Sequence, residues 1–220
     1  MKNYLFAFAV SLISIKSISQ NTTPTKSRFY LSSSYGLAGS FFVRSYDENP
    51  FPNSSFRYFY KKRFIGVAQN FGAGVQLKNN WEIQTGINFQ HFTRHITTVE
   101  TISGATLHID KDIHHRDHMW YGNVRKNYSK TNNVFAWGFG LFYSRPKQEE
   151  IEIYQQGVIN LTERTFKNSR LNEAGAFAEL AYEYKFQPKV NLGIKTQFYY
   201  TITAGYPESV TLFPYIKILF

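Results

Sequence analysis

The sequence contains no cysteine among its 220 residues. A chain without cysteine has no disulfide framework, no thiolate-bound metal and no lipid-modified cysteine. The chain also lacks any run of 18 or more apolar residues beyond its amino-terminal segment. Because a membrane-spanning helix needs about 20 such residues, the sequence excludes a helical membrane protein. It does not exclude membrane-spanning strands, since these are apolar on only one face.

Aromatic residues are abundant, with 21 Phe and 16 Tyr. This content is typical of strand-rich proteins and of proteins at membrane interfaces. The length suits one domain or one closed barrel. The net charge is +10, but the basic residues are scattered rather than gathered in one stripe. We therefore expect anionic lipid headgroups or acidic polymers as partners, and no nucleic acid.

The amino-terminal residues predict export. Lys2 gives a positive start, residues 4–15 form an apolar core, and Ser19 is a small residue of the kind that a signal peptidase requires. The alternative, a short anchor helix, needs a longer apolar run. We predict a signal peptide over residues 1–19, a periplasmic lead-in over 20–27 and one domain over 28–220.

The last twelve residues, 209–220, show a regular alternation. Side chains of a strand point by turns to its two faces. One face of this segment is apolar throughout, whereas the other carries a hydroxyl, a phenol and an ammonium group. A tilted strand of about 9–11 residues crosses a bilayer. We therefore predict a membrane-spanning strand whose lipid face consists of Leu212, Pro214, Ile216, Ile218 and Phe220.

Seven earlier segments alternate in a similar way. Residues 172–186 also fit a helical spacing, but an aromatic-rich end and a turn at Pro188 follow, which favours a strand. The eight expected strands are 28–42, 67–77, 81–94, 118–129, 134–145, 172–186, 190–202 and 209–220.

Short and long connections alternate between these strands. Tight polar turns are expected around Asn79, Asn132 and Pro188. Longer loops are expected over residues 43–64, 97–117 and 146–169, with a brief one over 203–208 and strand extensions near 151–154 and 158–162. Such alternation is typical of outer-membrane barrels. We predict an all-β fold, an eight-stranded antiparallel up-and-down transmembrane β-barrel.

The inward faces of the expected strands carry charges of both signs, which should pair across the lumen. The bore of an eight-stranded barrel is filled by side chains, so we predict a plugged lumen and no open diffusion pore. The predicted lumen charge network consists of Glu82, Arg94, Glu179, Glu183, Lys195 and Lys217.

A family resemblance agrees with this interpretation. The Gly-rich hairpin of residues 71–77 and 81–86, the segment Lys185 to Lys195 and the terminal Phe220 resemble the outer-membrane β-barrel family common in Bacteroidetes, to which PorT-like proteins linked to type IX secretion belong. The resemblance covers residues 28–220. It implies a place in the bacterial outer membrane after cleavage near Ser19, lipopolysaccharide among the lipid partners, and Phe220 as the signal for the barrel-assembly machinery.

Histidine and aspartate gather between residues 108 and 118. Imidazole and carboxylate together bind zinc, nickel or copper, but this spacing matches no recognised ligand motif, and a solvated loop is the favoured alternative. We predict no metal and no cofactor. The candidate ligands, should a metal bind, are His108, Asp110, His114, His115 and His118.

Two further features have alternative interpretations. Glu179 and Glu183 share a strand face and could serve acid–base chemistry, but pairing with lumen cations is favoured. No nucleophile, base and orienting group stand out together, so we predict no catalytic residues and no enzyme. The run 61–63, Lys-Lys-Arg, fits lipopolysaccharide phosphates or a solvated loop, and the latter is favoured.

The expected function is a structural or partner-binding role at the cell surface. The alternatives are an accessory of a protein secretion or assembly system, with an envelope protein as a further partner, and a lipid-modifying barrel enzyme. A soluble lipocalin-like barrel would place its apolar face inward, and the inward charges argue against it.

Overall fold

The computed structural model describes residues 29–41, 65–102, 105–153, 159–169 and 172–220. The predicted signal peptide, the lead-in and the loop over residues 43–64 lie outside this part of the chain. Among the residues described, no helix is long and apolar enough to cross a membrane. The elements are β1 (Phe29–Ser40), β2 (Ile65–Gln76), η3 (Lys78–Asn80), β3 (Trp81–Ile102), β4 (Ala105–Lys130), β5 (Asn133–Ser144), β6 (Lys147–Ile153), β7 (Ile159–Arg164), α3 (Phe166–Ser169), β8 (Glu173–Gln187), β9 (Val190–Thr201) and β10 (Tyr206–Leu219).

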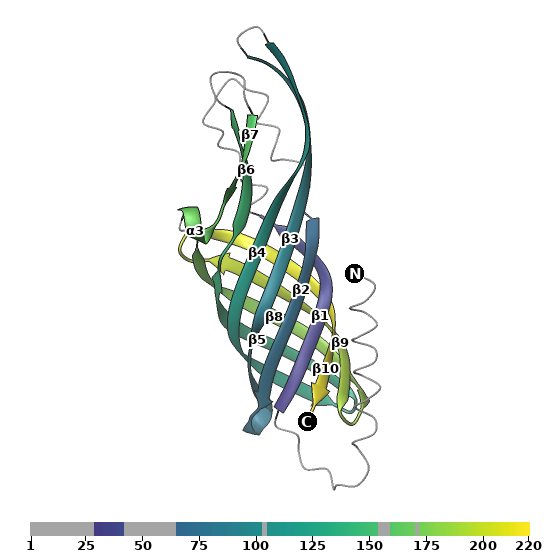
Figure 1. Cartoon of the computed structure of the whole chain (residues 1–220). Coiled ribbons are helices and arrows are strands. Elements are labelled where there is room, and N and C mark those ends of the chain that lie inside the picture. The colour runs from purple at the N-terminus through teal and green to yellow at the C-terminus, as the bar shows by residue number, and fades with distance from the viewer. Residues whose placement is uncertain (1–28, 42–64, 103–104, 154–158, 170–171) are drawn as a thin grey trace.

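Eight of these strands close into a barrel (Figure 1). Each pairs antiparallel with its neighbours in the order β3-β2-β1-β10-β9-β8-β5-β4, and the pairing of β3 with β4 completes the circle. The first and last strands meet in register from Tyr30 opposite Leu219 to Ser40 opposite Ser209. Closure leaves no unpaired sheet edge in the barrel wall. The predicted eight-stranded antiparallel barrel is confirmed, and residues 172–186, which also fit a helix, form strand β8.

The strands are joined by tight turns at the end of the barrel that carries η3. Asn79, Asn80 and Thr131 have positive φ angles of 59°, 61° and 56°. Asparagine tolerates this left-handed conformation better than most residues, which explains why the polar turns form where the sequence predicts them. The three predicted turns, around Asn79, Asn132 and Pro188, are confirmed.

The opposite end of the barrel carries two hairpins that project beyond the wall (Figure 1). The prediction of a loop over residues 97–117 was wrong, because β3 and β4 pair without interruption from Trp81 opposite Lys126 to Ile102 opposite Ala105. Threonine, valine and isoleucine are frequent in residues 96–102, and their β-propensity outweighs the polarity that suggested a loop. The predicted strand extensions are confirmed as β6 and β7, which pair with each other, and β6 also pairs with β4 at His115 and Arg116.

The barrel has an apolar exterior and a polar interior. Large hydrophobic side chains such as Leu37, Phe139 and Ile194 are more than half exposed on the outside, and the predicted lipid face of residues 212–220 points outward with them. Buried polar residues include Gln84, Asn88 and many of the lumen charges. This arrangement is the reverse of a soluble barrel and is that of a transmembrane one.

Aromatic residues ring the barrel near both ends. At the end with the tight turns, Trp81 and Trp137 meet edge to face at 6.3 Å, and Lys126 lies 5.0 Å from the Trp81 ring. At the other end, Trp120 packs against Tyr143 at 6.1 Å. Tryptophan and tyrosine favour the headgroup level of a bilayer. We call these rings the inner belt and the outer belt, and the strand residues between them form the membrane-spanning part.

Two glycines make room for a tyrosine inside the barrel. Gly72 and Gly86 face each other on β2 and β3, and a Cβ atom on either would collide with the Tyr121 hydroxyl. That hydroxyl instead accepts a hydrogen bond from Gln84 at 3.2 Å and donates one to Asn70 at 3.0 Å. Gly72 and Gly86 in the glycine-rich hairpin therefore leave space for the large lumen side chain of Tyr121 from β4.

Candidate functional site

Arg125 lies in the barrel interior, opposite Glu82 and close to the end that carries η3. It projects from β4 and is only 2% exposed. Its Nε atom is 2.7 Å from Glu82 Oε2, its Nη1 atom is 3.6 Å from Glu179 Oε1, and its Nη2 atom pairs with Glu183. One guanidinium thus contacts carboxylates from two strands. β3 is the neighbour of β4 on one side, and β8 lies beyond β5 on the other side. A planar guanidinium with five N–H donors is suited to such multiple contacts.

Lys217 is the second cation of this network. Its Nζ atom is 2.6 Å from Glu82 Oε1 and 3.3 Å from Glu183 Oε1. Glu183 also accepts hydrogen bonds from the Tyr215 hydroxyl and from Asn191, both at 2.7 Å. The ion pairs therefore extend from β4 through the lumen to β10, the closing strand.

Lys195 is buried in the same lumen but has a different partner. Its ammonium group donates to the amide oxygen of Asn70 at 2.8 Å and lies 5.5 Å from the Phe213 ring. Glu179 is held by Arg125 and by Gln197, which donates to Oε2 at 2.7 Å. Lys195 and Glu179 are both buried. Among the described residues, the hydrogen-bond partner of Lys195 is Asn70 and not a carboxylate.

Aromatic rings occupy the next layer of the lumen. Phe177 stacks on Tyr199 at 5.1 Å, and Tyr121 and Phe142 meet these rings edge to face at 5.7 and 5.4 Å. All four side chains are buried. The rings and the ion pairs thus lie in neighbouring layers of the lumen.

Sequence reasoning placed five of the six predicted lumen residues inside the barrel correctly. Glu82, Glu179, Glu183, Lys195 and Lys217 are each no more than 2% exposed. The side chain of Arg94, the sixth, lies outside the described part of the chain. Arg125 was missed because no inward face was assigned to the strand expected over residues 118–129. The alternation of β4 is unbroken there, so that Tyr121, Asn123 and Arg125 all face the lumen. Taking Trp120 as an outward belt residue identifies Arg125 as inward.

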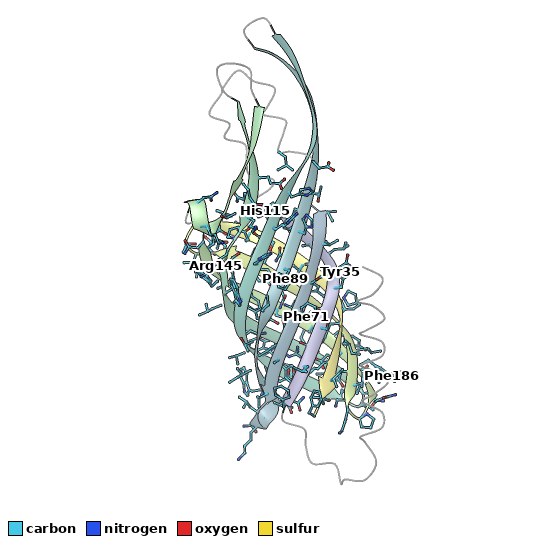
Figure 2. The ribbon with its side chains drawn as sticks, viewed as in Figure 1. Tyr35, Phe71, Phe89, His115, Arg145 and Phe186 are labelled. Atoms are coloured by element: carbon cyan, nitrogen blue, oxygen red, sulfur yellow. The ribbon has the colours of Figure 1, made fainter. Side chains whose placement is uncertain are left out.

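A second polar cluster lies at the outer mouth of the barrel, where Figure 2 shows His115 on β4. It consists of His115, Asp117 and Glu208, all buried, and one potential ligand atom from each lies within 4.8 Å of the others. His115 Nε2 is 2.9 Å from Asp117 Oδ1. Thr201 donates to Glu208 Oε2 at 2.9 Å. We call this group the mouth cluster.

The carboxyl groups near the mouth cluster, which lies beyond the outer belt, are crowded. Burial, together with the nearby carboxylates of Asp117 and Glu173, raises the pKa of Glu208 to about 9. Burial and Asp117 also raise the pKa of Glu173, whose Oε1 accepts a hydrogen bond from Tyr206 at 3.3 Å. Negative charge at the mouth therefore calls for a proton or a cation.

Of the three metal-ligand candidates whose side chains the structure describes, one belongs to this cluster. His115 is there. His114 faces the other side of β4, where its Nδ1 atom lies 3.4 Å from His91 Nε2. His118 packs edge to face on Phe89 at 5.2 Å. The side chains of His108 and Asp110 lie outside the described residues.

His91 and His114 form a pair of neighbouring imidazoles on the outside of the barrel wall. Thr93 lies 3.2 Å from His114 Nδ1. Burial lowers the pKa of His91, and the neighbouring Arg116 lowers it further. The His91 ring therefore favours the neutral form, which is the form that ligates metals.

Comparison with known proteins rests on the fold alone. No protein-family model and no protein of curated function matches this chain. Among solved structures, Neisserial surface protein A (NspA) matches with 11% identity and a TM-score of 0.50, covering 87% of this chain and 97% of its own. The Yersinia pestis attachment invasion locus protein Ail matches with 8% identity, a TM-score of 0.47 and coverage of 89% and 100%. Pseudomonas aeruginosa OprG matches with 8% identity, a TM-score of 0.44 and coverage of 88% and 94%. This chain has the fold of a bacterial outer-membrane β-barrel.

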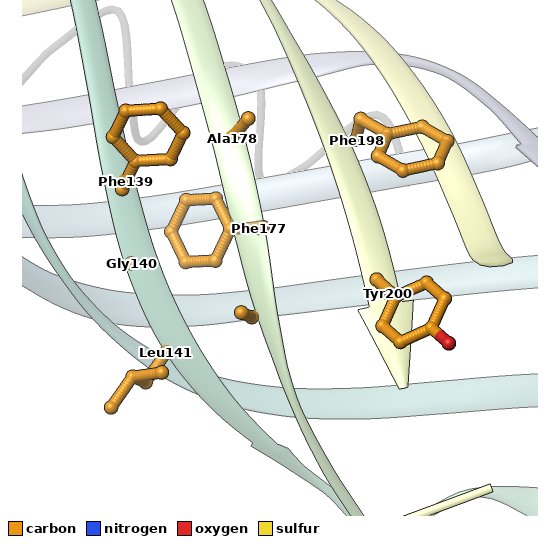
Figure 3. A pocket seen from close by; sticks show the side chains of 8 residues that line it. Phe139, Gly140, Leu141, Phe177, Ala178, Phe198 and Tyr200 are labelled. Carbon is orange, nitrogen blue, oxygen red and sulfur yellow. The ribbon is translucent and has the colours of Figure 1, made fainter. Parts of the chain in front are cut away.

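The outer-membrane barrel also has a shallow apolar hollow in its exterior wall (Figure 3). Ala176 and Ala178 form its floor, because their small side chains lie between the larger Phe139 and Leu141 of β5 and Phe198 and Tyr200 of β9. It lies on the membrane-facing side, where a lipid chain covers apolar surface. Apart from the Tyr200 hydroxyl, the side chains that line the hollow are apolar.

Proposed function

We propose that this protein is a closed barrel of the outer membrane that acts as a structural, partner-binding protein at the cell surface and does not conduct solutes. The observation that supports this most is the contact of Arg125 with three carboxylates, because a guanidinium held in this way blocks the bore near the end that carries η3. The hairpins β3–β4 and β6–β7 extend beyond the outer belt and provide the surface for a partner.

The proposed orientation follows from the connections. Outer-membrane barrels have short periplasmic turns and longer outer loops, so the end with η3 faces the periplasm and the two hairpins face the exterior. Phe220 then lies at the periplasmic end, where its backbone N–H donates to Phe29 at 2.9 Å and its ring lies 5.8 Å from the Phe29 ring. Cleavage near Ser19 and recognition of Phe220 by the assembly machinery stay predictions of the sequence.

The outer belt suggests how lipopolysaccharide is contacted. Arg145 lies 5.5 Å from the Trp120 ring and 5.6 Å from the Tyr143 ring, at the level where lipid headgroups meet the barrel. Its guanidinium suits phosphate. An Arg145→Gln variant that retains wild-type binding to lipopolysaccharide micelles would remove this residue from the proposal.

The closed lumen predicts that the refolded protein gives no stable conductance steps in planar lipid bilayers. Side chains and ion pairs leave no continuous water path through the bore of an eight-stranded barrel. Single-channel recording at neutral pH measures this directly, with a diffusion porin reconstituted in parallel as a positive control.

Two results would contradict the proposal in different ways. Reproducible conductance steps in protein whose heat-modifiable gel migration shows a folded barrel would mean that the lumen opens. Recovery of the protein in the soluble fraction of cells, without detergent, would mean that the barrel does not lie in the outer membrane.

The resemblance to the Bacteroidetes family with PorT-like members suggests a second candidate function, an accessory role in protein secretion. The projecting hairpins favour it, because they offer a surface on which envelope proteins could dock. Cross-linking followed by co-purification of envelope proteins would favour this role over a purely structural one. We propose no enzymatic activity, since Glu179 and Glu183 are both held by Arg125.

A further inference from the structure

We propose that His115, Asp117 and Glu208 bind one divalent first-row transition ion at the outer mouth of the barrel. The three side chains present an imidazole nitrogen and two carboxylate oxygens within 4.8 Å of one another. All three are buried, at 9%, 1% and 2% exposure. Their donor atoms are therefore held together in a site that is screened from bulk water.

Asp117 provides an independent sign that a ligand is required. Its Oδ1 atom faces His115, but its Oδ2 atom is buried and has no hydrogen-bond partner among the residues that the structure describes. A buried carboxylate oxygen without a partner costs free energy that a bound cation recovers.

The donor set indicates the class of ion. Imidazole suits zinc, copper, iron and nickel, whereas magnesium and calcium prefer oxygen ligands alone. Zinc binds histidine nitrogen and carboxylate oxygen at about 2.0–2.2 Å, so ligands on one ion lie at most about 4 Å apart. A separation of 4.8 Å closes to that value through small side-chain rotations.

The strand order gives the ion a structural effect. His115 and Asp117 lie on β4 and Glu208 lies on β10, and these strands are four neighbours apart in either direction around the barrel. One ion would therefore join opposite walls of the mouth. The three ligands come together only when the barrel is folded. A bound ion would therefore stabilise the folded state relative to the unfolded chain by mass action.

The test uses the full chain, refolded in detergent micelles without a polyhistidine tag, and Zn²⁺ as the probe. Equilibrium dialysis with metal analysis is expected to give one tightly bound Zn²⁺ per barrel. Asp117→Asn and Glu208→Gln are each expected to weaken binding by about 10-fold or more, since even the loss of a hydrogen bond to a metal ligand costs about 10–100-fold. Zn²⁺ is expected to raise the unfolding temperature of the wild-type protein and not that of the variants.

The matched control is His114→Ala, which removes an imidazole from the same strand but from the exterior His91 and His114 pair. It is expected to bind Zn²⁺ as the wild type does. Heat-modifiable migration confirms that each variant folds, and both carboxyl variants keep the size of the original side chain. The proposal is wrong if the folded wild-type protein binds no Zn²⁺, if both carboxyl variants bind it with unchanged affinity, or if His114→Ala abolishes binding. None of these outcomes depends on whether the barrel conducts.

Discussion

Replacing Arg125 with methionine is expected to destabilise the folded barrel by about 3–5 kcal/mol, the usual cost of removing one partner of a buried ion pair. Methionine fills part of the space, but it leaves Glu179 without a cation and Glu82 and Glu183 with only Lys217. Reversible urea unfolding in phospholipid micelles, followed by tryptophan fluorescence, measures the free energy of unfolding.

The control is Lys126→Met, one residue further along β4. Lys126 lies at the inner belt, where it contacts the carbonyl oxygen of Asn79 and the Trp81 ring, and its loss is expected to cost less than about 1 kcal/mol. Equal effects of the two substitutions would contradict the assignment of Arg125 to the interior.

Adding Glu183→Gln to Arg125→Met tests the network as a unit. Removing the charge of Glu183 leaves Lys217 to neutralise Glu82, with which it makes its shortest contact. The double variant is therefore expected to be more stable than the sum of the two single changes predicts. Simple additivity would mean that Arg125 and Glu183 do not interact across the lumen.

Strand parity explains which features of the lumen could be predicted from the sequence. In a closed barrel each side chain faces either lipid or lumen, so alternation alone assigns Glu82, Glu183 and Lys217 to the interior. Which of them meet could not be predicted, because contacts across the lumen depend on how the strands are staggered. Lys217 and Glu82 are 135 residues apart in the sequence and yet form an ion pair at 2.6 Å.

The mouth cluster was beyond sequence reasoning for a related reason. His115 and Asp117 were assigned to a loop, and Glu208 to a different, short loop. The extension of β3 and β4 past the outer belt turns His115 and Asp117 into strand residues with fixed inward parity. Only closure of the barrel then places Glu208 on the opposite wall at the same height.

Leu180→Arg is expected to destabilise the barrel by about 2–4 kcal/mol, the cost of an arginine on the lipid face near the bilayer midplane. Leu180 is the middle residue of the 15-residue strand β8 and is 51% exposed on the exterior. Two further variants separate the effects of charge and of depth on stability from the effect of losing apolar surface. Leu180→Ala removes the side chain without adding charge and is expected to cost much less. Tyr184→Arg places the same charge near the inner end of the strand, where the cost falls to about 0–1 kcal/mol.

The depth dependence is what distinguishes a transmembrane barrel from a soluble one. On a soluble barrel, Leu180 would face water, and arginine at either position would have little effect or would improve solubility. In a bilayer, the two arginine variants must differ because only the strand centre lies far from the headgroups. Urea unfolding in phospholipid vesicles measures the difference. Equal stability of Leu180→Arg and Tyr184→Arg would show that the apolar exterior does not face lipid, and the inward charges would then need another explanation.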